Sequence, residues 1–195
     1  MTTMGPYGPH APDGVHLRDL TVADVDLLEP LWRALLDGIR AADTVVPIVP
    51  HEESWPMRQA EYEDLLSRGK SFGLVALRGD EPIGYAVVRV EDGPDPVWRT
   101  GGRYVELTSL SVAPAERDRG IGTRLLDEVE EWLSDLEVDG FVIGVDAVND
   151  AALRFYERRG FRVGYHLLYG RLGHPAAVTE PTDDESPETA SHGEV

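Results

Sequence analysis

The residues best suited to chemistry form a short loop from Arg117 to Gly122, with the sequence RDRGIG, which leads directly into a helical pattern. Two glycines let the backbone approach a ligand closely, and two arginines add positive charge. The helix that follows presents unpaired N–H groups and the positive end of its dipole. These features together can hold a pyrophosphate. A glycine pair between a strand and a helix can also form only a tight turn, and the loop by itself leaves both interpretations open.

The loop differs from two common nucleotide-binding patterns. It lacks the Gly-Lys-Ser/Thr of a Walker A loop. The position of the third glycine in a dinucleotide fingerprint is held by Leu125. Neither of these two classes of site is therefore expected.

The apolar segment before the loop changes face partway along. Val105 and Leu107 share one parity, whereas Leu110 and Val112 have the other. A strand keeps its parity unless a residue is inserted, so the change predicts a β-bulge near Thr108–Leu110. A bulge leaves backbone amides free to hold an amide-containing ligand or a carbonyl oxygen that becomes negative. A central strand buried on both faces would give the same pattern, and the parity alone does not decide.

Three motifs, "LTSLSVAP", "RDRGIG" and "NDAALRFYERRGF", occur in an order and spacing that resemble the GNAT superfamily of acyl-CoA N-acyltransferases. The resemblance extends over Val15–Leu172, and its specific motifs lie within Tyr104–Phe161. The loop matches the family pattern Arg/Gln-x-x-Gly-x-Gly/Ala at Arg117, Gly120 and Gly122. The resemblance implies an N-acetyltransferase in which a primary amine attacks acetyl-CoA directly, without a covalent enzyme intermediate.

The resemblance also assigns residues to acetyl-CoA. Amides after the bulge would hold the thioester carbonyl and the pantetheine arm, and amides of the loop would hold the pyrophosphate. A residue that opens the next helix would contact the cofactor, and it can cap that helix at the same time. The expected set is Leu110, Ser111, Val112, Ala113, Arg117, Asp118, Arg119, Gly120, Ile121, Gly122, Thr123 and Asn149.

Two residues are the candidates for proton transfer. Tyr156 matches the tyrosine that in many family members lies near the CoA sulfur and acts as general acid. An aromatic residue near a helix end can equally belong to the core. Glu106, in the strand before the bulge, is the candidate general base, because several members carry a base there. Strand glutamates are often simply solvated, and many relatives have no dedicated base.

The acceptor site is expected between the first two helices and the loop before the strand that carries the bulge. Its candidate residues are Glu52, Trp55 and Trp98, because aromatic rings with carboxylates suit a primary amine or polyamine. Acetylation of a protein N-terminus or a lysine is the alternative within the same class. A non-catalytic acyl-CoA sensor or an interaction module is the alternative of another class.

The remaining pattern predicts the elements that position these groups. A hairpin followed by alternating strands and helices predicts a mixed α/β sheet. The resemblance makes this an α/β (α+β) domain with a mixed, mostly antiparallel sheet of six to seven strands, about four helices, and a splay between strands four and five. Strands are expected at Val15–Arg18, Phe72–Leu77, Ile83–Val90, Arg103–Val112, Phe141–Val145 and Phe161–Leu172, and helices from Thr21 to Ile39, Ser54 to Leu66, Gly120 to Glu137 and Ala151 to Arg159.

Composition limits the remaining possibilities. A formal charge of -18 disfavours nucleic acid as a partner, and no apolar run is long enough for a membrane helix. The absence of cysteine excludes a thiolate nucleophile, and the six histidines show no metal-ligand spacing, so no metal site is expected. We expect a flexible arm at residues 1–14, the catalytic domain at 15–172 and a disordered acidic tail at 173–195. A cytoplasmic protein is expected, and a homodimer would fit similar proteins.

Overall fold

A computed structural model describes residues 14–170, except residues 43, 45, 70, 94, 98, 100 and 137. The acidic tail expected at 173–195 therefore lies outside the described residues, as does the arm expected at 1–14 apart from Gly14. The chain divides into two units after Arg162. All helices and strands of the described residues belong to the first unit.

The centre of the first unit is a five-stranded sheet in the order β1-β2-β3-β4-β5. The first four strands pair antiparallel with their neighbours, and β5 pairs parallel with β4. This confirms the mixed α/β class and the hairpin formed by the second and third strands. The strands are β1 Val15–Asp19, β2 Phe72–Arg78, β3 Glu81–Asp92, β4 Arg103–Val112 and β5 Val142–Ile143.

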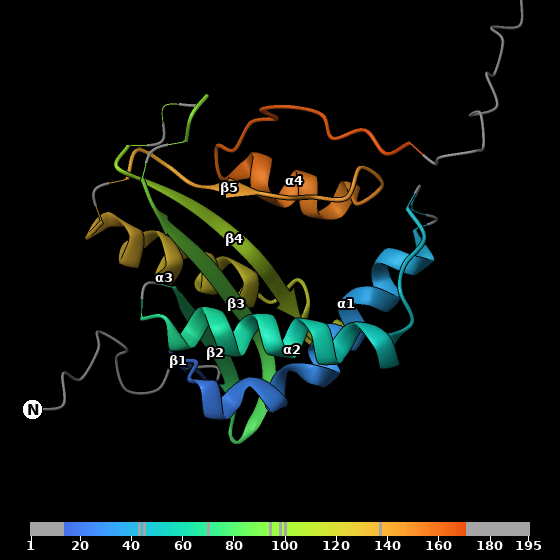
Figure 1. The fold of residues 1–195 in the computed structure, drawn as a ribbon. Coiled ribbons are helices and arrows are strands. Elements are labelled where there is room, and N and C mark those ends of the chain that lie inside the picture. The colour runs from blue at the N-terminus through green and yellow to red at the C-terminus, as the bar shows by residue number, and fades with distance from the viewer. Residues whose placement is uncertain are drawn as a thin grey trace, which may run out of the picture. The chain divides into compact units, whose positions relative to one another are not determined.

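Helices cover both faces of this sheet (Figure 1). On one face, a 3₁₀ helix and the first two α-helices pack against side chains such as Val75, Tyr85 and Val87. On the other face, α3 and α4 pack against side chains of opposite parity, such as Ala86 and Val88. The helices are η1 Val22–Leu28, α1 Glu29–Ala41, α2 His51–Ser67, η2 Pro114–Glu116, α3 Ile121–Ser134 and α4 Asp150–Arg158.

The segment expected as one five-turn helix from Thr21 to Ile39 is instead η1 followed by α1. Pro30 explains the difference, because a proline has no N–H to continue the α-helical bonding of the preceding turn. Thr21 and Asp24 form a capping box at the start of η1, and the Thr21 N–H donates to Asp24 Oδ2 at 3.0 Å.

The second helix begins three residues earlier than expected, at His51 rather than Ser54. The amides of Glu53 and Ser54 both donate to the Pro50 carbonyl, at 3.1 and 2.9 Å. Pro56 therefore lies inside α2 and not in its first turn, and only its own missing N–H interrupts the helical ladder.

The strand expected at Phe161–Leu172 is wrong for the residues that the structure describes. Residues 161–170 have no regular secondary structure, and residues 171 and 172 are not described. Leu167 and Leu168 are adjacent and are 91% and 89% exposed, so side chains of both parities are exposed at this point. A strand is stable only when it is paired, and here the described residues give five strands instead of six to seven.

Candidate active site

The strands β4 and β5 diverge in the middle of β4. They pair only at Glu106–Val142 and Leu107–Ile143 among the described residues. On the other side of β4, the register with β3 shifts at the same point, and Thr108 is the additional residue. This confirms the bulge expected from the parity change. The Thr108 Oγ1 is buried and has no hydrogen-bond partner among the described residues.

Beyond the residues that pair with β5, two backbone amides of β4 point toward the side on which β5 no longer pairs. Ala113 donates its N–H to the Ile83 carbonyl of β3 at 2.9 Å. Because amides alternate along a strand, Ser111 also faces β3, whereas the N–H groups of Leu110 and Val112 point away from it. Of the four amides expected to hold the thioester carbonyl and pantetheine, these two are therefore oriented to do so.

The loop between β4 and α3 leads into the N-terminus of α3 through two left-handed residues. Asp118 and Gly120 both have positive φ angles, of 60° and 79°. The first helical bond of α3 runs from the Arg124 N–H to the Gly120 carbonyl at 3.0 Å, so the three preceding amides have no helical partner. Such a run of amides at a helix N-terminus favours a phosphate group.

Glu116 links this loop to the sheet. Arg78 of β2 donates to Glu116 Oε2 at 2.8 Å, and Arg119 donates to the same oxygen at 3.2 Å. The hydrogen bonds from Arg78 hold the pKa of Glu116 below its usual value, with a smaller effect from Arg119. Arg117 donates through Nε to the Val112 carbonyl at 3.2 Å, so both loop arginines have a hydrogen-bond partner within residues 112–116.

Asn149 caps α4. Its Oδ1 accepts the Ala152 N–H at 3.0 Å, which satisfies one of the unpaired amides of the first turn. This bond establishes the capping role that the sequence suggested. Contact between Asn149 and a cofactor stays a prediction.

Tyr156 of α4 lies in the core on the face that α3 covers, with 8% of its surface exposed. Its ring centroid is 5.1 Å from that of Phe155 and 5.6 Å from that of Phe161. Burial raises the pKa of Tyr156 to about 12, so the phenol keeps its proton at neutral pH. A protonated phenol can donate a hydrogen bond to a departing sulfur.

Glu106 lies on the opposite face of β4, which α2 covers. Its Oε2 is 3.5 Å from Arg89 Nη1 of β3, and the Glu106 side chain is 29% exposed. On the same face, beyond the bulge, the Tyr62 hydroxyl donates to Ser109 Oγ at 2.6 Å. Glu106 and Tyr156 therefore lie on opposite faces of the sheet.

The structure describes two of the three acceptor candidates. Glu52 is exposed in the first turn of α2. Trp55 is only 7% exposed and packs in the core between α1, α2 and the sheet. Trp98 lies outside the described residues.

Four residues near Glu106 and the bulge were not predicted from the sequence, namely Arg89, Glu61, Tyr62 and Ser109. One signal was present, because Arg89 is the only charged residue in the expected strand Ile83–Val90. A lone charge in an apolar strand needs a partner, but the sequence does not say which side chain supplies it.

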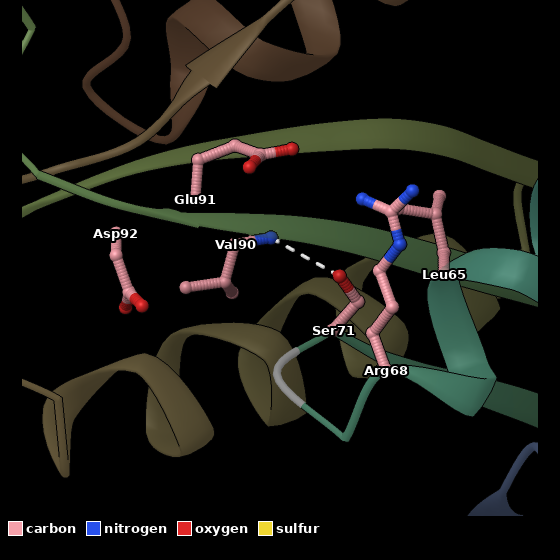
Figure 2. A pocket seen from close by; sticks show the side chains of 6 residues that line it. All are labelled: Leu65, Arg68, Ser71, Val90, Glu91 and Asp92. Atoms are coloured by element: carbon pink, nitrogen blue, oxygen red, sulfur yellow. Dashed lines mark hydrogen bonds between the residues drawn. The ribbon is translucent and has the colours of Figure 1, made fainter.

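A separate open pocket of about 390 Å³ lies between the end of α2 and the end of β3 (Figure 2). Its walls include Leu65 and Arg68, and the Val90 N–H donates to Ser71 Oγ at 3.2 Å. This end of β3 pairs with the start of β4, away from the bulge, and we assign the pocket no role. Within the described residues, no cluster of His, Asp or Glu is suited to a metal ion, and no helix is long and apolar enough to cross a membrane.

Comparisons with known proteins show which family and which relatives the chain resembles. The sequence pattern of the acetyltransferase (GNAT) family matches residues 32–161. N-alpha-acetyltransferase RimI of Mycobacterium tuberculosis is 32% identical over 153 residues, which cover 77% of this chain and 89% of the relative. N-alpha-acetyltransferase 60 of Xenopus tropicalis is 28% identical over 134 residues, which cover 62% of this chain and 53% of the relative. The chain thus matches about half the length of that second relative.

A solved structure of an aminoglycoside N-acetyltransferase in complex with CoA has the same fold. Its TM-score is 0.63 at 17% sequence identity, and the match covers 85% of this chain and 97% of that chain. At this level of identity the likeness shows the fold alone.

Proposed function

Because the chain belongs to the acetyltransferase (GNAT) family, whose members use acetyl-CoA as co-substrate, we propose that it acetylates the α-amino group of a polypeptide N-terminus. The observation that carries the proposal is the divergence of β4 and β5 after Leu107. It opens one side of β4 directly after Glu106 and Leu107, with Tyr156 on the opposite face of the sheet from Glu106. Acetyl transfer from acetyl-CoA is general to the family, so the experiment must test whether the acceptor is a polypeptide N-terminus.

The residues at the divergence fit acetyl-CoA. The amides of Leu110 and Val112 hold the thioester carbonyl and the pantetheine arm, and the amides at the start of α3 hold the pyrophosphate. A hydrogen bond from an amide to the thioester oxygen stabilises the negative charge that develops there during attack. The amides of Ile121 and Gly122 complement the negative charge of the pyrophosphate through the positive end of the α3 dipole.

Two side chains move the protons of the reaction. Glu106 accepts the proton that the ammonium form of the acceptor must lose, directly or through a water molecule. The neutral amine nitrogen attacks the thioester carbon, the carbon–sulfur bond breaks, and Tyr156 donates its proton to the departing thiolate, because the buried phenol is protonated at neutral pH. The nitrogen loses its second proton as the amide bond forms, and this proton returns to the Tyr156 phenolate through solvent.

The choice of a polypeptide α-amine follows from the two curated relatives. Both are N-alpha-acetyltransferases by name, and the first is 32% identical over 77% of this chain. The burial of Trp55 adds support by removing one aromatic wall expected for a small cationic acceptor.

A small amine or polyamine is the second candidate acceptor. Glu52 and Glu53 are both exposed in the first turn of α2 and could attract a cationic molecule. The cytoplasmic location and a homodimer remain predictions, as does the contribution of the acidic tail. A non-catalytic acyl-CoA sensor would bind acetyl-CoA without acetylating any acceptor.

The test compares matched acceptors with acetyl-CoA by mass spectrometry. The acceptors are a peptide with a free N-terminus and an internal lysine, the same peptide acetylated at its N-terminus, and a polyamine such as spermidine. We expect one acetyl group on the free peptide and none on the blocked peptide. Equal acetylation of both peptides, or acetylation of the polyamine alone, would overturn the proposal.

A further inference from the structure

Four charged side chains of alternating sign form a line from α2 to β4 beside the bulge. Arg58 Nη1 lies 2.7 Å from Glu61 Oε2 within α2. Glu61 Oε1 lies 2.7 Å from Arg89 Nη2 of β3, and Arg89 Nη1 lies 3.5 Å from Glu106 Oε2 of β4. All four side chains are partly buried, with exposed fractions between 26% and 33%. Their charges are therefore less screened than those of an ordinary surface pair.

The line is asymmetric at Arg89. The guanidinium makes a short contact with Glu61 and a longer one with Glu106. Glu61 is itself fixed by Arg58, whose guanidinium lies 4.5 Å from the centre of the Trp32 ring. Because Arg89 is held by Glu61, it cannot turn fully toward Glu106 to form a two-bond pair.

A second contact fixes α2 against β4 on the other side of the bulge. Tyr62, the residue after Glu61, is fully buried and donates its hydroxyl proton to Ser109 Oγ at 2.6 Å. Ser109 follows Thr108, the additional residue of the bulge. Consecutive residues of α2 therefore contact both flanks of the bulge, one through Arg89 and one directly.

We propose that Glu61 and Arg89 are positioning residues for Glu106. Arg89 orients the Glu106 carboxylate toward the acceptor, and Glu61 holds Arg89 far enough away to leave that carboxylate available as a proton acceptor. The inference rests on the proposed role of Glu106 as general base. It adds two residues that act through Glu106 and need not touch either substrate.

The two residues have opposite effects on Glu106, which a structural role would not produce. In Glu61→Gln, Arg89 loses its tighter partner and pairs closely with Glu106, which favours the ionised carboxylate. In Arg89→Gln, the ionised carboxylate loses its neighbouring cation. We expect the acidic limb of the kcat profile to move by about half a pH unit, to lower pH in Glu61→Gln and to higher pH in Arg89→Gln.

The experiment measures kcat and KM from about pH 4 to 9, a range that includes the ordinary titration of a glutamate carboxylate, with acetyl-CoA and whichever acceptor the wild-type protein acetylates. The conservative variant Arg89→Lys keeps the positive charge and should keep the acidic limb near its wild-type position. The matched control is Arg68→Gln, which removes the exposed arginine that follows the last residue of α2 and pairs with Asp64 of that helix. Urea unfolding of each variant checks that it is folded.

Parallel measurement of Glu106→Gln separates the two proposals. If Glu106→Gln loses activity but both positioning variants keep the wild-type limb, or move it in the same direction, the inference is overturned and the role of Glu106 stands. If Glu106→Gln keeps its kcat at every pH, Glu106 is not the base and both proposals fail. Opposite shifts together with an inactive Glu106→Gln support the inference.

Discussion

Replacing Tyr156 with phenylalanine tests the buried phenol most directly. The substitution removes one oxygen and keeps the ring that packs 5.1 Å from Phe155 and 5.6 Å from Phe161. At neutral pH we therefore expect a free energy of unfolding close to that of the wild-type protein. The effects should appear in alkaline solution and in the chemical step.

The size of the alkaline effect follows from the pKa of Tyr156, which burial raises from 10.0 to about 12. Between these values the unfolded chain ionises its phenol while the folded chain keeps the proton. Below pH 10 the phenol is protonated in both states and causes no loss of stability; as the pH rises toward 12 the free energy of unfolding falls. The total fall is about 2–3 kcal/mol, of which about 1.4 kcal/mol has occurred by pH 11.

Urea unfolding at pH 8 and pH 11 measures this loss. From pH 8 to pH 11 the wild-type protein should lose about 1.4 kcal/mol more than Tyr156→Phe. Tyr62 and Tyr85 are also buried, and burial raises the pKa of each, but both proteins contain them and their contributions cancel. Equal losses in the two proteins would refute the inference that Tyr156 is held protonated by burial.

The same variant tests the general acid in a thiol-release assay. We expect kcat to fall by about 100-fold, with KM for acetyl-CoA changed less than twofold, because the lost proton donor acts on the leaving sulfur. The chain has no cysteine, so the protein adds no background to a thiol reagent. An unchanged kcat would reject the acid role of Tyr156 and leave it as a core residue.

Four other variants give separate predictions. Glu106→Gln should lower kcat by about 100-fold at neutral pH, with a smaller deficit at high pH where the acceptor amine loses its proton without help; a pH-independent deficit would count against a base. Gly120→Ala should lower the free energy of unfolding by about 1 kcal/mol in urea, because φ is 79°. Gly122→Ala should leave the free energy of unfolding unchanged, since its Cβ would meet Phe155 and Val112 at an ordinary 3.7 Å. The same substitution should weaken acetyl-CoA binding in calorimetry. Equal behaviour of the two glycine variants would contradict the assignment of the loop to the pyrophosphate. Arg159→Ala should lower the thermal midpoint by breaking contacts of 2.6 and 2.8 Å to Asp127 and Glu130, and an unchanged midpoint would show that these contacts do not join α4 to α3.

The parts of the fold that could be predicted from the sequence depend on local patterns. The parity change in β4 located the bulge, because side chains alternate along a strand and only an inserted residue shifts them. The bulge is at Thr108, within the expected range. The glycine loop was likewise located by residue types, since Gly120 adopts the positive φ that its type allows.

Errors arose where the outcome depends on residues distant in the sequence or on one missing donor. Pro30 divides the first helix because it lacks an N–H, a detail that the apolar spacing does not reveal. The segment at Phe161–Leu172 has the composition of a strand, but a strand must also pair with a neighbouring strand, and the sheet of the described residues contains no strand from this segment. Trp55 is an acceptor candidate that the structure buries, because the size of tryptophan suits the core as well as a cationic ligand, and its contact with an acceptor stays a prediction.

The contacts around Glu106 could not be predicted, since they join three elements. Arg89 meets Glu106 through the register of β3 and β4, and it meets Glu61 through the packing of α2 on the sheet. Neither the register nor the helix rotation is set by a short motif. The lone charge in β3 was visible, whereas the identity of its partners was not.

Amide hydrogen exchange by NMR, with and without acetyl-CoA, tests the central claim that the divergence of β4 and β5 holds the co-substrate. We predict that acetyl-CoA slows exchange at the amides of Leu110, Val112 and residues 121–123. Exchange should change little at Ala113, whose N–H is already bonded to the Ile83 carbonyl at 2.9 Å. Protection that appears elsewhere and leaves the Leu110 and Val112 amides unaffected would contradict the claim.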